Sequence, residues 1–162
     1  MTPEQILESK PPVAPQLSLI WTAVVDIAPR EDWGMTPKGQ RYVVPILGGK
    51  VFSGPGIDGL SGVVLPGGAD RQLVTSDGFK TLDALYEMQM DDGSVLTVHN
   101  RVRIDETVAP DPYKLSVIDV TAPVGKLEWM NRRIFVGTLE TAKPERGAVI
   151  IRGWGLKEYG QP

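Results

Sequence analysis

Hydrophobic and polar residues alternate along much of this chain. Between residues 17 and 27 every second position is apolar, and the same period returns in several later segments. A period of two places apolar side chains on one face of an extended chain, so it predicts strands with one buried side. We expect strands at residues 17–27, 41–47, 51–52, 60–65, 113–121, 133–140 and 148–156, with three more centred on residues 66–100.

Glycine and proline separate these strands. The chain has 18 Gly and 14 Pro, spread between the apolar runs. About nine or ten short strands with almost no helix are typical of a closed antiparallel barrel or of a sandwich. Gly153-Trp154-Gly155 favours the barrel, because strongly coiled strands bend at glycine. We therefore predict an all-β fold, a single closed antiparallel β-barrel of about 8–10 strands with a short N-terminal helix.

Three connecting segments carry weaker signals. Residues 26–38 are rich in charge, Pro and Gly and are expected to form a loop. Gly48-Gly49 indicates a turn or a kink, and Pro45 suits an edge or a bulge. Residues 126–131 are expected to form one helical turn.

The N-terminus has a helix start signal. Thr2 can cap, Pro3 suits the first helical position, and Gln5 stands where a capping box has Glu or Gln. The helix must end before Pro11-Pro12. We divide the chain into an arm at residues 1–16, whose helix is expected to pack on the outside of the domain, and a barrel domain at residues 17–162.

The hairpins within the central segment decide which polar side chains meet. A three-residue loop at Asp91-Asp92-Gly93 places Asp83 opposite Arg101 and pairs apolar positions with apolar positions. For the other hairpin we expect a two-residue Asp77-Gly78 turn, which places Gln72 opposite Asp83. The predicted polar face then carries Asp70, Gln72, Asp83, Glu87, His99, Arg101 and Arg103. The opposite face carries Leu73, Leu82, Tyr86, Met88, Val98 and Val102, with Arg71 and Asn100 as polar exceptions.

Two interpretations of the polar face stay open. It can face water, in which case the Asp83–Arg101 pair contributes under about 1 kcal/mol. Alternatively it lines a cavity inside the barrel. There Asp83 or Asp70 would be a general base, Arg101 would bind an oxyanion, and His99 would carry a second proton.

Other candidate residues have structural alternatives. Tyr86 is a further candidate proton carrier. Asn100 lies on an apolar face, and a buried amide needs partners, from the backbone first or from a ligand. Trp129 is either a core anchor or an aromatic wall at the mouth of the barrel.

Composition excludes several classes of protein. The 162 residues have a net charge of −3, which argues against a nucleic-acid partner. No apolar run is long enough to span a membrane, and no signal peptide is visible. With no Cys and a single His, we expect no disulfide, no thiol chemistry and no metal site. The glycine pairs lack the context of a phosphate loop, so we expect no cofactor, and a cytoplasmic location is the default.

A series of motifs resembles one known family over roughly residues 17–156. These are Val44-Pro45-Ile46, Gly48-Gly49, Phe52-Ser53-Gly54-Pro55, Leu65-Pro66-Gly67-Gly68-Ala69-Asp70, Gln72, Asp77-Gly78, Leu82-Asp83-Ala84, Tyr86, Asn100, Trp129, Asn131 and Phe135-Val136-Gly137. In this order they resemble the domain of unknown function 3237 family. The resemblance implies a compact antiparallel β-barrel and raises the weight of the cavity interpretation. It implies no particular reaction.

Two positions depart from the family pattern. The family usually has Trp after Gly-Gly-Ala-Asp, where this chain has Arg71, and often has Arg before the motif Tyr, where this chain has Leu85. If these positions touch a ligand, the resemblance implies that the ligand differs from that of a typical member.

These observations give three hypotheses for function. The first is a cofactor-independent enzyme that moves a proton next to a carbonyl of an apolar or aromatic metabolite, in an elimination, isomerisation, cyclisation or addition. The second is a non-catalytic binder of such a ligand. The third is a structural protein, with its sheet surfaces forming a homodimer or larger homo-oligomer.

Overall fold

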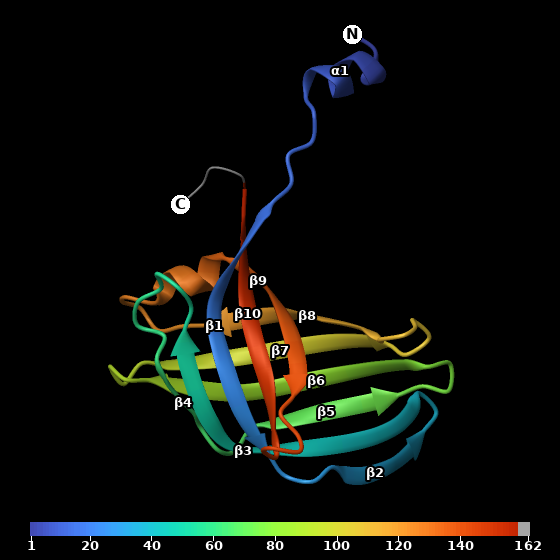
Figure 1. Cartoon of the computed structure of the whole chain (residues 1–162), viewed down its shortest axis with the longest axis vertical. Helices are drawn as coiled ribbons and strands as arrows, with labels where there is room; N and C mark the ends of the chain where they lie inside the picture. Colours follow the sequence, from blue (N-terminus) through green and yellow to red (C-terminus); the bar gives the residue numbers. More distant parts are fainter. Residues whose placement is uncertain (159–162) are drawn as a thin grey trace.

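The alternating segments pair with their neighbours into one antiparallel sheet that closes on itself (Figure 1). This computed structural model describes residues 1–158, so residues 159–162 of the predicted barrel domain lie outside the described part. In chain order the elements are α1 Pro3–Ser9, β1 Gln16–Ile27, β2 Glu31–Thr36, β3 Gly39–Ser53, β4 Gly62–Val64, β5 Ala69–Val74, β6 Phe79–Met90, β7 Val95–Asp105, β8 Tyr113–Thr121, the 3₁₀ helix η1 Glu128–Arg132, β9 Ile134–Thr141 and β10 Ala148–Lys157.

The first strand closes the ring, because β1 pairs with both β10 and β3. β4 and β5 follow one another in a single position between β3 and β6. Over the described residues this makes a closed eight-stranded barrel, with β2 paired only to the outer part of β3. The predicted all-β closed barrel with a short N-terminal helix is therefore confirmed.

Two predictions about the segments between strands are wrong. β2 lies within residues 26–38, where the composition predicted only a loop. β3 is one strand of 15 residues and not two, because Gly48-Gly49 bends the chain without ending it. A side chain at Gly49 would stand 2.1 Å from the Val24 carbonyl oxygen, so glycine lets β3 pass close to β1 there.

The N-terminal helix begins as its sequence predicts but lies elsewhere than expected. Thr2 and Gln5 form the capping box from both sides. No residue of α1 is buried, and Figure 1 shows the helix standing away from the barrel. The prediction that this helix packs on the outside of the domain is wrong for the single chain.

The register between β6 and β7 is the predicted one. Asp83 lies opposite Arg101, and Leu85 lies opposite His99. The loop has three residues and ends on Gly93, whose φ of 91° is a value that glycine adopts without strain.

The register between β5 and β6 differs from the prediction by one residue. Gln72 lies opposite Leu82, and it is Arg71 that lies opposite Asp83. The Thr75 amide donates to the Phe79 carbonyl at 2.9 Å, which closes a three-residue loop at residues 76–78 in place of a two-residue turn. Since a shift of one residue moves every side chain of a strand to the other face, Asp70 and Gln72 point into the barrel.

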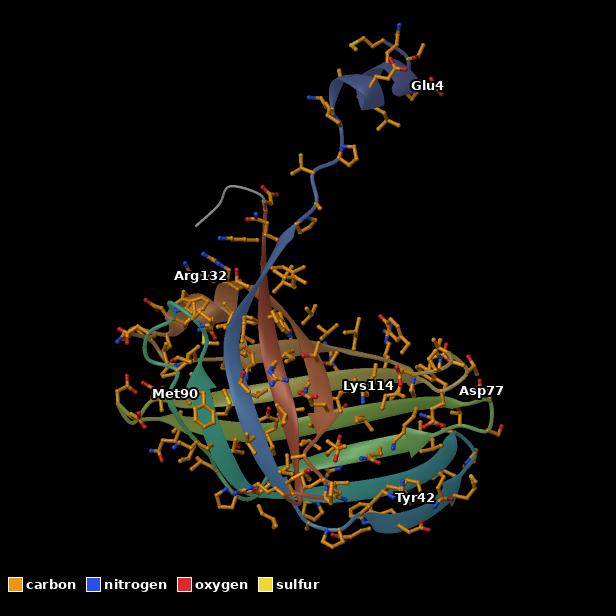
Figure 2. All side chains as sticks on the ribbon, viewed as in Figure 1. Glu4, Tyr42, Asp77, Met90, Lys114 and Arg132 are labelled. Carbon is orange, nitrogen blue, oxygen red and sulfur yellow. The ribbon has the colours of Figure 1, made fainter. Side chains whose placement is uncertain are left out.

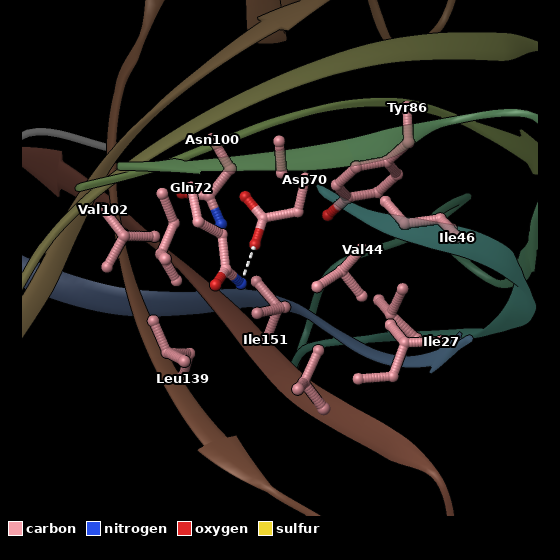
Figure 3. Close-up of a pocket in the computed structure, with 14 residues that line it drawn as sticks. Ile27, Val44, Ile46, Asp70, Gln72, Tyr86, Asn100, Val102, Leu139 and Ile151 are labelled. Carbon is pink, nitrogen blue, oxygen red and sulfur yellow. Dashed lines mark hydrogen bonds between the residues drawn. The ribbon is translucent and has the colours of Figure 1, made fainter. Parts of the chain in front are cut away.

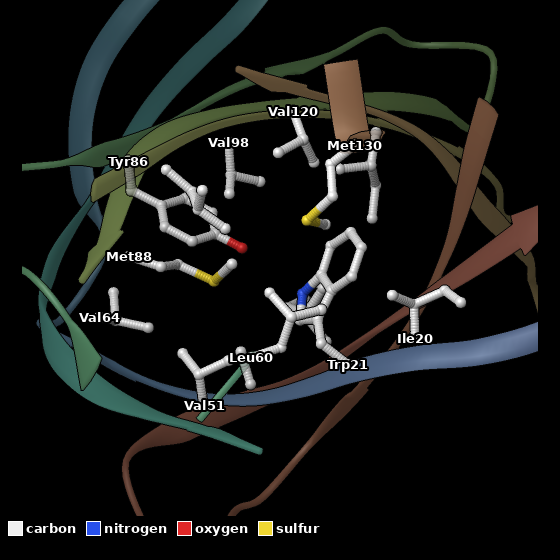
Figure 4. Close-up of a cluster of buried hydrophobic side chains, with 14 of the residues drawn as sticks. Ile20, Trp21, Val51, Leu60, Val64, Tyr86, Met88, Val98, Val120 and Met130 are labelled. Carbon is white, nitrogen blue, oxygen red and sulfur yellow. The ribbon is translucent and has the colours of Figure 1, made fainter. Parts of the chain in front are cut away.

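The interior of the barrel has a filled part and a hollow part. Around the plug formed by Leu60, Leu127 and Met130, apolar side chains fill the space between the strands (Figure 4). Trp21 is fully buried in this part, and its ring meets Phe135 edge to face with 5.3 Å between centroids. The part nearer the 76–78 loop is not filled in this way, and the cavity lies there.

We predict that Gly153→Ala destabilises the barrel. A Cβ at Gly153 would lie 2.4 Å from atoms of the Trp21 ring, which is buried and has no space to move into. Overpacking of this kind costs about 1–3 kcal/mol of unfolding free energy. Urea unfolding followed by tryptophan fluorescence measures it.

The matched control is Gly147→Ala, because a Cβ there comes no closer than 4.0 Å to another residue and the position is exposed. It should change the unfolding free energy by less than about 0.5 kcal/mol. Equal effects of the two substitutions would contradict the packing of Trp21 on Gly153.

Candidate functional site: a cavity inside the barrel

A cavity of about 110 Å³ lies inside the barrel between β5, β6, β7 and the strands facing them (Figure 3). Its walls are mostly aliphatic, with ten apolar residues and four polar ones. The apolar residues are Val25, Ile27, Val44, Ile46, Leu82, Ala84, Val102, Leu139, Val149 and Ile151, and the polar ones are Asp70, Gln72, Tyr86 and Asn100. Apolar walls with a few converging polar groups are typical of small-molecule sites.

The strand register places the polar groups together. Asp70 lies opposite Ala84, and Ala84 lies opposite Asn100, so these three inward-facing residues form one row across β5, β6 and β7. Tyr86 follows two residues after Ala84 and therefore shares its face. The small Ala84 side chain leaves open the space between Asp70 and Asn100, and the row becomes one wall of the cavity.

Four polar atoms of the cavity have no hydrogen-bond partner among the residues that the structure describes. They are Asp70 Oδ1, Gln72 Oε1, Tyr86 Oη and Asn100 Oδ1. The one hydrogen bond between these side chains runs from Gln72 Nε2 to Asp70 Oδ2, at 2.9 Å. Because buried polar groups are nearly always hydrogen-bonded, these atoms are matched to water or to the polar atoms of a ligand.

The cavity shifts the protonation of its two titratable groups. Burial raises the pKa of the Asp70 carboxyl above its ordinary value, against smaller opposing effects from Gln72 and from the charge of Lys80. Burial also raises the pKa of the Tyr86 hydroxyl. Tyr86 is therefore a proton donor for hydrogen bonds, and Asp70 is a stronger base than an exposed carboxylate.

The other predicted catalytic residues lie on the outer surface. Asp83 Oδ1 lies 2.6 Å from His99 Nε2, with their side chains 55% and 38% exposed. Arg101 pairs with Asp119 at 3.0 Å. None of these lines the cavity, so the prediction that Asp83, His99 and Arg101 converge on a ligand beside Asp70 is wrong. The β6–β7 register was right, but these residues point out of the barrel.

The two positions that depart from the family pattern are also exposed. Arg71 lies opposite Asp83 on the outer face, and Leu85 is 50% exposed. The prediction that Arg71 contacts the ligand is therefore wrong for this cavity, because neighbouring positions on β5 and β6 alternate between inside and outside.

Trp129 also lies away from the cavity. It packs against the apolar core, with its ring centroid 6.3 Å from that of Phe135, and borders a shallow groove at the plugged part of the barrel. Of the nine predicted site residues, the structure brings together four: Asp70, Gln72, Tyr86 and Asn100.

Sequence reasoning missed the apolar wall residues, and above all Ala84. One signal pointed to it: Ala84 is the small residue opposite Asn100 in a register that was predicted correctly. Within residues 1–158 no three side chains of the metal-binding types come together. In the same part of the chain no helix is both long enough and apolar enough to cross a membrane.

Known proteins similar to this chain share its fold. The family described as "Protein of unknown function (DUF3237)" matches residues 15–156. A UPF0311 protein of Clostridium acetobutylicum is 35% identical over 111 residues, which are 60% of this chain and 68% of that protein. A crystal structure of a conserved protein of unknown function from Rhodopseudomonas palustris has a TM-score of 0.78 and 27% identity, covering 90% of this chain and all of that one.

A second similar structure is described as an enzyme. It comes from Penicillium herquei and has a TM-score of 0.69 over 90% of this chain and 97% of its own. At 20% identity the likeness shows a common fold and nothing about the reaction.

We predict that Asp70→Asn raises the stability of the protein at neutral pH. Burial raises the pKa of the Asp70 carboxyl in the folded protein above its value in the unfolded chain. Such a group contributes its full stability at pH values below the pKa of the unfolded chain, and this contribution is lost as the pH rises through the pKa of the folded protein. The asparagine variant has no charge to bury. Its gain in melting temperature should therefore be present at pH 7 and vanish below the ordinary carboxyl pKa of 3.8.

The control is Asp111→Asn, an exposed carboxylate in the loop before β8. Thermal unfolding of the three proteins across pH measures the effect. If Asp70→Asn is no more stable than the wild type at pH 7, or if the control gains as much, Asp70 is not a buried carboxyl.

Proposed function

Because the chain belongs to the DUF3237 family, whose function is unknown, we propose a function from its own cavity: cofactor-independent acid–base chemistry on a small, largely apolar molecule that carries a carbonyl group. The observation that carries the proposal is the row of unpartnered polar atoms around an apolar space. Asp70 is the proposed base, and Tyr86 and Asn100 are the proposed partners of the carbonyl oxygen.

The proposed reaction starts with proton transfer from carbon. Ionised Asp70 takes the proton from the carbon next to the carbonyl and becomes the neutral acid. The electron pair of the C–H bond forms a C=C bond, and the π pair of the carbonyl moves onto its oxygen. The Tyr86 hydroxyl and the Asn100 amide donate hydrogen bonds to that oxygen. Return of the proton from neutral Asp70 to a different carbon completes an isomerisation, and its transfer to a leaving group, as the bond from that group to the next carbon breaks, completes an elimination. An addition or a cyclisation runs in reverse: Asp70 takes the proton of a nucleophile, from a second molecule or from the same one, as that nucleophile bonds to an unsaturated carbonyl compound, and then returns the proton to the carbon next to the carbonyl.

The environment of Asp70 supports this role. A general base works best when its pKa lies near the working pH, and burial moves the Asp70 pKa in that direction. Gln72 donates a hydrogen bond to one carboxylate oxygen of Asp70, and the other oxygen, Oδ1, has no partner among the described residues. The position of the carboxylate is thus fixed by one atom while the other remains available to a ligand.

Lys80, whose charge acts on Asp70, and Arg30, whose charge acts on Lys80, favour a ligand with a negatively charged or electron-rich group. Lys80 is half-buried and lies two residues before Leu82 on the inward face of β6. Burial and the nearby charge of Arg30 lower the Lys80 pKa, and Arg30 stacks 3.7 Å from the centroid of the Tyr42 ring. Neither cation takes part in an ion pair within residues 1–158.

A non-catalytic binder is the second candidate. Among residues 1–158, Asp70 is the only carboxylate that lines the cavity, and His99 lies outside it. A protein that needs only to hold a ligand requires no second proton carrier, so one carboxyl, one phenol and two amides would suffice.

Deuterium exchange tests the proposed chemistry without knowledge of the final product. A panel of small ketones, phenolic ketones and keto acids is incubated with the protein in D₂O, and loss of the proton next to the carbonyl is followed by NMR. We expect protein-dependent exchange for at least one class. Asp70→Asn should reduce it by about 10²–10⁴-fold, the usual contribution of a general base. The rate should rise with pH as Asp70 ionises.

The matched control is Asp83→Asn, since Asp83 is on the neighbouring strand but faces outward. It should leave exchange within about twofold of wild type, as surface positions usually do. Equal losses in both variants would refute Asp70 as the base. Ligand binding that Asp70→Asn weakens, without any exchange, would favour the binder, and absence of both binding and exchange would refute both candidates.

A further inference from the structure

The N-terminal arm, here residues 1–15, does not pack on the described part of its own chain. Every residue in it is exposed. Its apolar side chains are exposed as well, with Ile6 at 42%, Leu7 at 70% and Val13 at 66%. A seven-residue helix is well below the roughly 12–15 residues at which an isolated helix becomes marginally stable in water. Exposed apolar side chains on a helix too short to be stable alone are typical of a segment that docks on another surface.

Prolines hold the arm away from its own barrel. Pro11, Pro12 and Pro15 lie between α1 and β1, and such a segment favours an extended, semi-rigid conformation of about 3.1 Å per residue. Figure 2 shows Glu4 on the helix far from the barrel, and Arg132 at the end of the barrel from which the arm leaves. A stiff spacer of this kind disfavours folding back onto the same molecule.

A groove of about 360 Å³ lies at the same end of the barrel, and we call it the end groove. Its floor is apolar and contains Ile20, Ile57, Trp129 and Phe135. A second hollow, bordered by Pro15 at the base of the arm, shares Arg133, Leu156 and Lys157 with it. The end groove is separate from the cavity that holds Asp70.

The charges of the arm and the end groove are complementary. Glu4 and Glu8 are one helical turn apart and lie on the same side of α1. Arg133 and Lys157 border the end groove, and Arg132 borders the adjoining hollow. None of these five side chains belongs to an ion pair within the described chain.

We propose that two copies of this chain exchange N-terminal arms, so that the helix of each copy lies in the end groove of the other. Ile6 and Leu7 cover the apolar floor, and Glu4 and Glu8 face the cationic rim. The exchange is reciprocal, as in a closed two-fold dimer, and leaves no unfilled groove for a third copy. The proposal does not depend on the function of the cavity.

Sedimentation velocity over a wide range of chain concentrations tests the dimer. The wild type should be a dimer, and Ile6→Asp combined with Leu7→Asp should be a monomer with an unchanged circular dichroism spectrum. Met35→Asp is the control, because Met35 is a 74% exposed apolar residue of β2, which is not part of the end groove. It should remain dimeric. A monomeric wild type, or a dimer that survives the arm substitutions, would overturn the proposal.

Charge reversal distinguishes exchange between two chains from docking within one. The first variant reverses the arm with Glu4→Lys and Glu8→Lys, and the second reverses the rim with Arg132→Glu and Arg133→Glu. Each variant alone should dimerise at least ~10-fold more weakly, because like charges then meet. In a mixture both arm–groove contacts are again between opposite charges, so a heterodimer should form with nearly the wild-type affinity.

The mixture is decisive because docking within one chain cannot be restored by a second chain. A tag on one variant identifies the heterodimer by mass. If the mixture dimerises no better than the separate variants, arm exchange is wrong, even if the wild type is a dimer through another surface.

Discussion

The register between β5 and β6 is the constraint on which the candidate site depends. Three residues, not two, form the loop at residues 76–78, and the third is Gly78 with a φ of 84°. The Asp77 carboxylate accepts hydrogen bonds from the Thr75 hydroxyl and the Phe79 amide, which fixes the loop. With one residue fewer, Asp70 and Gln72 would face water beside Asp83, and Arg71 would point into the barrel with Tyr86 and Asn100.

A close-packed interior stabilises a barrel but leaves no cavity, and this barrel meets these two requirements in separate parts. The part around Trp21 and the plug is closely packed and stabilises the fold. The other part leaves space over Ala84, and there the chain has buried a carboxyl, a phenol and two amides with one hydrogen bond between them. Burying polar groups in this way costs stability. A sequence that keeps these groups in a cavity is consistent with their use in binding.

Much of the fold could be predicted from the sequence, because a period of two and regularly spaced glycines identify strands and their turns. The bounds of β8 and the whole β6–β7 register were predicted correctly. β2 could not be seen, since Glu31–Thr36 has only two large apolar residues and pairs on one side alone. β2 forms because it pairs with β3, although its own pattern of apolar residues is weak.

The site was predicted only in part, for a physical reason. The direction of a strand's side chains depends on one residue of loop length, and the sequence around Asp77-Gly78 fits both a two-residue and a three-residue loop. The similar Asp92-Gly93 hairpin, in which the Asp92 carboxylate also accepts from a backbone amide two residues later, was the available clue. Asn100 and Tyr86 could be assigned to the inner face because their register rested on the correctly predicted loop.

The function proposed for the cavity depends most on the burial of Asp70 inside the barrel. An NMR titration of the Asp70 carboxyl carbon, assigned with the Asp70→Asn variant, measures this directly. We predict that its pKa lies above the ordinary value of 3.8, because burial is the largest influence on it. We also predict that the signal shifts when a ligand enters the cavity. A pKa at or below 3.8 would contradict the prediction of a raised value, because burial would then not be the largest influence on Asp70.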